Sequence, residues 1–150
     1  MSKKITHFIL TLFLLFTNSA AAETVNFSLE SIKWGKPGGG GGYPVGVRTQ
    51  LIETDESTAG ISYYALFPAG SHFDLHWHSF DEFATVLRGE VTLQLNGEAL
   101  KLAVGGYVKI PGRAEHSWDV PNETGSEQDV ILLVRRRDLR TFISRNRWAL

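Results

Sequence analysis

The chain has no cysteine and only one methionine among its 150 residues. Without cysteine there is no disulfide, so a hydrophobic core has to provide the stability of the fold. Thiolate ligands are excluded as well, and any metal ion must be held by histidine, carboxylate or backbone oxygen. Fifteen basic residues face sixteen acidic ones, a formal net charge of −1. This near-neutral balance gives no case for nucleic-acid binding.

Long apolar runs are also scarce, and the longest one lies near the start, at residues 8–16 (FILTLFLLF). It follows a short basic segment with Lys3 and Lys4 and precedes the small, polar stretch TNSAAAET. This order is typical of a secretory signal peptide, with a cleavage site between Ala22 and Glu23. The alternative is a membrane anchor, but the run falls well short of the roughly 20 residues that span a bilayer.

We therefore expect residues 1–22 to be removed and the protein to be periplasmic or secreted, with no stable membrane anchor after cleavage. No cysteine follows the cut, so a lipid anchor at a new N-terminal cysteine is excluded. About 128 residues would remain, which is enough for one domain with a single core. Loss of Lys3 and Lys4 leaves a formal charge of about −3.

Past residue 23, short alternating segments separated by Gly, Pro, Asn and Asp predict a protein made of strands. The predicted strands are TVNFSL, VRTQLIE, GISYYALF, EVTLQL, EALKLAV, GGYVKIPG and DVILLVRRR. Asn96-Gly97 stands between two of them and is a strong hairpin signal. Many short strands at this spacing favour an all-β sandwich or closed barrel.

Two segments do not fit a strand. Residues 36–44 (KPGGGGGYP) predict a flexible loop within an N-terminal arm at residues 23–45. Residues 138–150 predict a basic tail or a short helix, because Leu139, Phe142 and Ile143 are spaced three and four apart. Six arginines lie within residues 135–147, and we expect a solvated edge rather than a site for anionic lipid or polysaccharide.

The segment HFDLHWHSFDE, residues 72–82, holds three of the five histidines and three carboxylates. In a regular strand His72, Asp74, His76 and His78 would lie on one face, where burial without a ligand would be costly. Glu82 follows after a short turn. We therefore predict a metal site in which His76 and His78 are ligands and Glu82 can add a carboxylate.

His116 completes this set, because every histidine beyond the expected signal peptide lies either in this segment or at position 116. Three imidazoles and one carboxylate suit one divalent transition metal ion, such as Zn, Cu, Mn, Ni, Co or Fe. His72 is a second candidate for proton transfer beside Glu82, although a surface histidine is an equal alternative. Asp74 is a candidate partner for a ligand imidazole.

These residues resemble the cupin family. The first cupin motif is matched at every defined position, by Gly70, His76, His78, Glu82 and Gly89. The second motif is matched by Gly105, Pro111 and His116, whereas Arg113 and Val120 replace its glycine and its asparagine. The resemblance covers residues 45 to 136 and is strongest to small exported single-domain cupins that begin with a Trp-Gly pair, here in IKWGKP.

The resemblance implies a single-domain cupin-type jelly-roll β-barrel at residues 46–137, with a metal in its mouth. It implies the same four ligands, His76, His78, Glu82 and His116. Cupins include dioxygenases, isomerases and lyases as well as members that only bind or sense, so the fold does not settle the function. Many cupins pair through barrel edges, which leaves a homodimer open.

The sequence is compatible with two functions. The first is a metal-dependent enzyme of dioxygenase or isomerase type that acts on a small organic molecule, with Glu82 or His72 moving protons. The second is a non-catalytic module that binds or senses a small ligand and keeps the metal as a structural element. Export would favour Zn or Cu over Fe(II), because metal is then acquired outside the cytoplasm.

Overall fold

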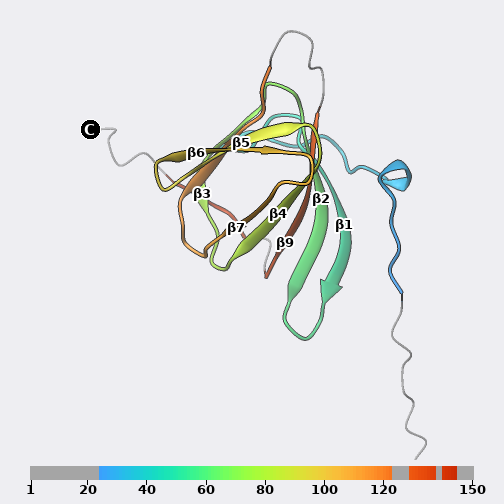
Figure 1. Cartoon of the computed structure of the whole chain (residues 1–150). Helices are drawn as coiled ribbons and strands as arrows, with labels where there is room; N and C mark the ends of the chain where they lie inside the picture. Colours follow the sequence, from blue (N-terminus) through green and yellow to red (C-terminus); the bar gives the residue numbers. More distant parts are fainter. Residues whose placement is uncertain (1–23, 123–128, 138–139, 145–150) are drawn as a thin grey trace, which may run out of the picture.

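The computed structural model describes residues 24–122, 129–137 and 140–144 (Figure 1). Regular structure in these ranges is almost entirely strand, apart from one short 3-10 turn (η1) at Leu29–Ser31. The strands are β1 Arg48–Asp55, β2 Gly60–Phe67, β3 His72–Trp77, β4 Glu82–Arg88, β5 Glu90–Leu95, β6 Glu98–Ala103, β7 Tyr107–Ile110, β8 His116–Asp119, β9 Val130–Arg136 and β10 Phe142–Ile143. Among the described residues, no helix has the length and apolar character needed to cross a membrane.

The strands form two five-stranded sheets in which every pair is antiparallel. One sheet has the order β1-β2-β9-β4-β7 and the other β10-β3-β8-β5-β6. Strands far apart in sequence lie side by side, such as β2 with β9 and β3 with β8, which is the arrangement of a jelly roll. The predicted all-β jelly-roll fold is confirmed.

The hydrophobic core lies between the two sheets. Val86 of β4 and Leu132 of β9 enter it from one sheet, while Leu93 of β5 and Trp118 of β8 enter it from the other. All four side chains are at most 3% exposed. Val120, which occupies the position of the cupin motif's asparagine, is also buried in this core.

An irregularity in β3 changes which of its side chains face the core. Phe73 pairs with Trp118 and His76 pairs with His116, so β3 uses one residue more than β8 over this stretch, which is a β-bulge. Phe73 and His76 are therefore both buried, whereas His72 and Asp74 are exposed. The prediction that His72, Asp74, His76 and His78 share one face is wrong, because the bulge interrupts the alternation.

Residues in two of the turns have positive φ angles. Asn96 and Gly97 both have positive φ angles, of 54° and 81°, and connect β5 to β6, which confirms the predicted hairpin. Arg113 has a φ of 67°, a left-handed conformation that glycine adopts more easily. This conformation explains why the cupin motif places a glycine where this chain has arginine.

Two predicted elements are wrong. Residues 24–28 of TVNFSL form no strand, and Val25 and Phe27 are exposed, because this segment lies outside both sheets. The alternative of a short C-terminal helix is also wrong for residues 140–144, the part of residues 138–150 that the structure describes. Phe142 and Ile143 form β10, which pairs with Trp77 and His76 of β3. Residues 138–139 and 145–150, like the expected signal peptide, lie outside the described residues.

The glycine-rich segment folds back over the edge of the barrel. Gly40 and Tyr43 exchange two backbone hydrogen bonds, and the Gly42 carbonyl accepts a hydrogen bond from the Asp74 amide at 2.9 Å. A Cβ at Gly42 would lie 3.0 Å from Ile143, so the close approach to β10 requires glycine there. This turn brings the Tyr43 ring to 5.0 Å from that of Phe73.

A pair of valines tests the position of the core. Val91→Ala removes two methyl groups from a fully buried site and should lower the free energy of unfolding by about 2 kcal/mol. Val104→Ala, at a side chain that is 66% exposed, is the matched control and should change it by less than about 0.5 kcal/mol. Denaturant unfolding of both variants measures the difference. Equal losses would contradict the described core.

Candidate metal centre

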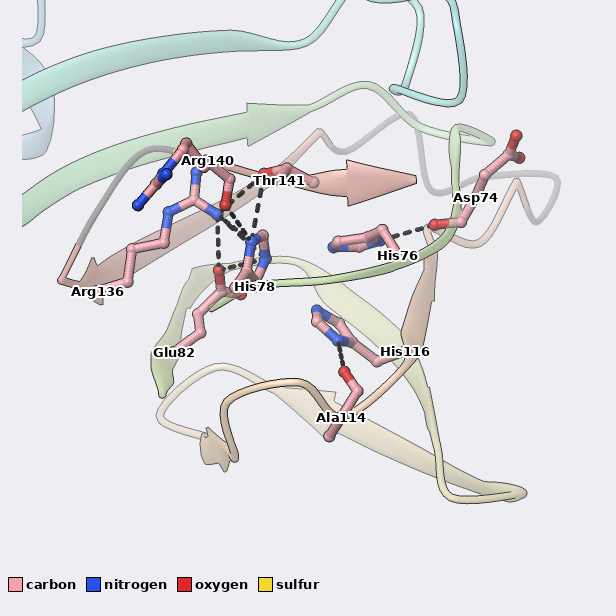
Figure 2. Close-up of polar contacts among 9 residues, drawn as sticks. All are labelled: Asp74, His76, His78, Glu82, Ala114, His116, Arg136, Arg140 and Thr141. Carbon is pink, nitrogen blue, oxygen red and sulfur yellow. Dashed lines mark hydrogen bonds and ion pairs between the residues drawn. The ribbon is translucent and has the colours of Figure 1, made fainter. Parts of the chain in front are cut away.

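Three histidines meet at one end of the barrel (Figure 2). His76 lies near the end of β3, His78 follows that strand, and His116 begins β8. One ring nitrogen of each lies within 4.8 Å of the others, and all three side chains are at most 3% exposed. The structure thus brings together the three histidines that the sequence nominated as ligands.

Two of these imidazoles are oriented by backbone carbonyls. His76 Nδ1–H donates to the Asp74 carbonyl at 2.7 Å, and His116 Nδ1–H donates to the Ala114 carbonyl at 3.0 Å (Figure 2). Each ring therefore keeps the lone pair on Nε2. Both Nε2 atoms are buried and have no hydrogen-bond partner among the described residues. A buried acceptor without a donor is costly, and a bound cation would remove that cost.

Burial keeps the rings of His76 and His116 uncharged. It lowers the pKa of His76 to about 3, with a smaller contribution from nearby His116, and it lowers the pKa of His116 as well. Phe73 stacks on His76 with ring centroids 3.7 Å apart, and Trp118 meets His116 edge-on at 6.3 Å. Neutral imidazoles in an apolar surround are the form that binds a transition metal.

Glu82, the first residue of β4, lies beside His78 rather than within the three-histidine cluster. Its Oε2 is 3.0 Å from His78 Nε2 and 3.4 Å from Arg136 Nη1, and its side chain is 6% exposed. Burial raises the pKa of this carboxyl, but the hydrogen bond from His78 and the Arg136 charge lower it by more. Glu82 is thus a carboxylate at the rim of the cluster, and its role as a fourth ligand stays a prediction.

Arg136 is a member of the site that sequence analysis missed. It was grouped with the solvated arginines of residues 135–147, yet it is 9% exposed at the end of β9. Its Nη1 lies 2.7 Å from His78 Nδ1 and 3.1 Å from Thr141 Oγ1, and its guanidinium lies 5.5 Å from the Tyr63 ring centre. Arg136 shares its strand face with buried Val130, Leu132 and Val134, so a period of two pointed inward at this position, although Ile131 on the other face is buried as well.

A cavity of about 260 Å³ adjoins the cluster. Its polar end is formed by His78, Glu82, Arg136, Thr141 and Tyr63. Its remaining walls are mainly apolar, formed by residues that include Val47, Leu51, Ala65, Phe67, Phe73, Trp118, Leu132 and Val134. Tyr43 and Pro44 of the glycine-rich turn line it too. The arrangement joins a candidate metal centre to a chamber suited to a small, largely apolar molecule.

His72 and Asp74 lie away from this centre. The His72 side chain is 51% exposed, with Nδ1 2.6 Å from Asp119 Oδ1 and Nε2 3.4 Å from Asp74 Oδ1. Neither residue lines the cavity. Asp74 still contributes to the centre, but through its backbone carbonyl on His76 and not through the carboxylate that the sequence suggested.

The buried pair of Glu82 and Arg136 predicts strong coupling in the metal-free protein. Glu82→Gln or Arg136→Met alone leaves one buried charge without its partner and should cost about 3–5 kcal/mol of unfolding free energy. The double variant should lose clearly less than the sum of the two. Chemical unfolding of all four proteins at pH 7, with chelator present, measures the coupling. Additive losses would show that the two charges do not interact.

Comparison with known proteins agrees with this fold. Residues 63–134, from β2 to β9, match the family described as the cupin domain. No curated protein matches the chain. Among solved structures, a cupin-2 domain protein from Rhodospirillum rubrum, Rru_A2000, has a TM-score of 0.65 at 16% identity, over 81% of this chain and 80% of that one.

Two further structures are similar. KdgF from a Halomonas species has a TM-score of 0.59 at 14% identity, over 78% of this chain and 96% of its own. The DMSP lyase DddQ from Ruegeria pomeroyi has a TM-score of 0.56 at 19% identity, over 65% of this chain and 51% of its own. At these identities the structures support the fold alone. The family match across the strands that carry the site shows that residues 63–134 of this chain are a cupin domain, and the similar structures share its fold.

Proposed function

We propose that this protein is a mononuclear metal-dependent enzyme acting on a small organic molecule. The observation that carries the proposal is the pair of buried Nε2 atoms of His76 and His116, which have no hydrogen-bond partner among the described residues. His78 supplies the third ring nitrogen, and Glu82 supplies a carboxylate as the fourth ligand. Three histidines and one carboxylate suit Zn, Cu, Mn, Ni or Fe.

Four protein ligands leave a position for substrate when the ion is five- or six-coordinate. A bound ion would supply Lewis-acid chemistry, or oxidative chemistry where it is redox-active, which corresponds to an isomerase-type or a dioxygenase-type reaction. The chain's own part is to exclude water with the apolar walls and to hold the substrate at the polar end of the cavity. Glu82 lies there, at a place where it can accept a proton from a bound molecule.

The adjoining cavity favours an enzyme over a module in which the metal is only structural. A purely structural site has a closed ligand set and needs no chamber beside it. Here His78 and Glu82 line a cavity of about 260 Å³. The similar structures include a protein named as a DMSP lyase, so this fold does support lyase chemistry in another chain.

A matched pair of histidine variants tests metal binding. Elemental analysis of the protein isolated from its exported compartment should find about one divalent transition metal per chain. His76→Ala should lose most of it, whereas His72→Ala, at an exposed histidine of the same strand, should retain it. Equal metal content in wild type and His76→Ala, or metal in neither, would refute the proposed site. Mn, Fe, Ni or Cu would direct the search to O2-dependent and isomerase substrates, and Zn to hydrolytic ones.

We further propose that the protein is exported, on the basis of the leader pattern at residues 1–22. Intact mass and N-terminal sequencing of protein from the native host should show a chain that starts at Glu23. The membrane fraction of a variant with Ala20 and Ala22 replaced by bulky residues should accumulate the uncleaved form, because the signal still directs export but is not removed. A wild-type chain that retains Met1 and remains in the cytoplasm would contradict export.

A further inference from the structure

We propose that the cavity takes a small carboxylate with an apolar body, and that Arg136 is its anchor. The proposal deepens the metal-dependent function above and rests on it in part. It follows from the charge balance at the polar end of the cavity, from the contacts that hold Arg136, and from the apolar character of the other walls.

In the metal-free molecule the charges at this end cancel. The described residues that line the cavity include one carboxylate, Glu82, and one guanidinium, Arg136, and these lie 3.4 Å apart. A divalent cation at the histidines raises the net charge of this buried region from zero to +2. Uncompensated charge in a dry site is expensive, so the loaded site favours an anionic ligand.

His78 links the metal to Arg136. Its Nε2 lies 3.0 Å from Glu82 Oε2, and Arg136 Nη1 lies 2.7 Å from its Nδ1 and 3.1 Å from its Nε2. The shorter contact fits a ring that donates from Nε2 to Glu82 and accepts at Nδ1. A metal on Nε2 requires the other tautomer, in which Nδ1 carries the proton and has the Arg140 carbonyl at 3.1 Å as its acceptor. Nδ1 then no longer accepts from Arg136, so this one contact of Nη1 is exchanged for a contact with an anionic ligand.

A carboxylate matches this requirement better than other groups. Its two oxygens accept the paired N–H groups of a guanidinium in one plane. The rest of the ligand must be apolar and small, because the remaining walls include Phe67, Leu132 and Val134 and the cavity holds only about 260 Å³. A benzoate-like molecule combines these properties.

The test is calorimetric titration of the Zn-loaded protein with benzoate and with its neutral analogue, benzyl alcohol. Benzoate should bind at least about 10-fold more tightly. Arg136→Gln should weaken benzoate binding roughly 10- to 100-fold, the range for a lost hydrogen bond to a charged group, without changing Zn content. Arg135→Gln, on the exposed face of the same strand, should bind benzoate as wild type does.

A comparison of metal-free variants separates this inference from the proposed function. Glu82→Gln removes the partner charge of Arg136, so metal-free Glu82→Gln should bind benzoate more tightly than metal-free wild type. The addition of Arg136→Gln should abolish that gain. A chain that takes up no Zn would refute the metal site, and this metal-free comparison alone would then decide the role of Arg136.

Three results would overturn the inference: equal affinity for benzoate and benzyl alcohol, unchanged benzoate affinity in Arg136→Gln, or tighter binding of phenyl phosphate than of benzoate. Where Arg136→Gln does not fold, Arg136→Lys replaces it. That variant keeps the charge but not the planar pair of donors, and it should weaken benzoate more than phenyl phosphate.

Discussion

The burial of three imidazoles at the junction of β3 and β8 is the constraint on which the site depends. His76 and His116 are paired across these strands, and each ring is fixed by a carbonyl two residues before it in sequence, at Asp74 and Ala114. The same backbone that forms the sheet therefore sets the tautomer of each ring. Since both Nε2 atoms are buried without a partner among the described residues, the fold bears a cost there that a cation relieves.

The ligand histidines were predictable because residue type and spacing alone restrict them. Without cysteine, histidine is the softest ligand available beside carboxylate and backbone oxygen, and only four histidines lie beyond residue 22. The exclusion of His72 was not predictable from alternation. It depends on a bulge that adds one residue to β3 between Phe73 and His76, and a bulge has no firm signature in a single sequence. The strand itself could be predicted, but not the face of each side chain.

Arg136 shows the opposite case, in which the signal was present but hidden. Arg136 lies two residues beyond buried Val134 on the same strand face, yet the neighbouring Arg135 and Arg137 made the segment resemble a solvated basic run. Burial of this arginine depends on Glu82, Tyr63 and Thr141, which come from three other parts of the chain. Likewise, β10 forms because Phe142 and Ile143 pair with the edge of β3. Contacts of this kind are set by tertiary structure, which local propensity does not contain.

The Glu82–Arg136 pair also bears on how folding and metal binding relate. In small zinc domains the metal supplies the folding energy, and the chain without it is unfolded. Here the core between the two sheets is formed by apolar side chains, and Glu82, the buried carboxylate among the described residues, already has Arg136 as a cationic partner. Among the described residues that line this end of the cavity, the carboxylate of Glu82 and the guanidinium of Arg136 thus compensate each other. Folding therefore does not depend on a bound ion, and a cation captured afterwards would add charge to a site that is already built.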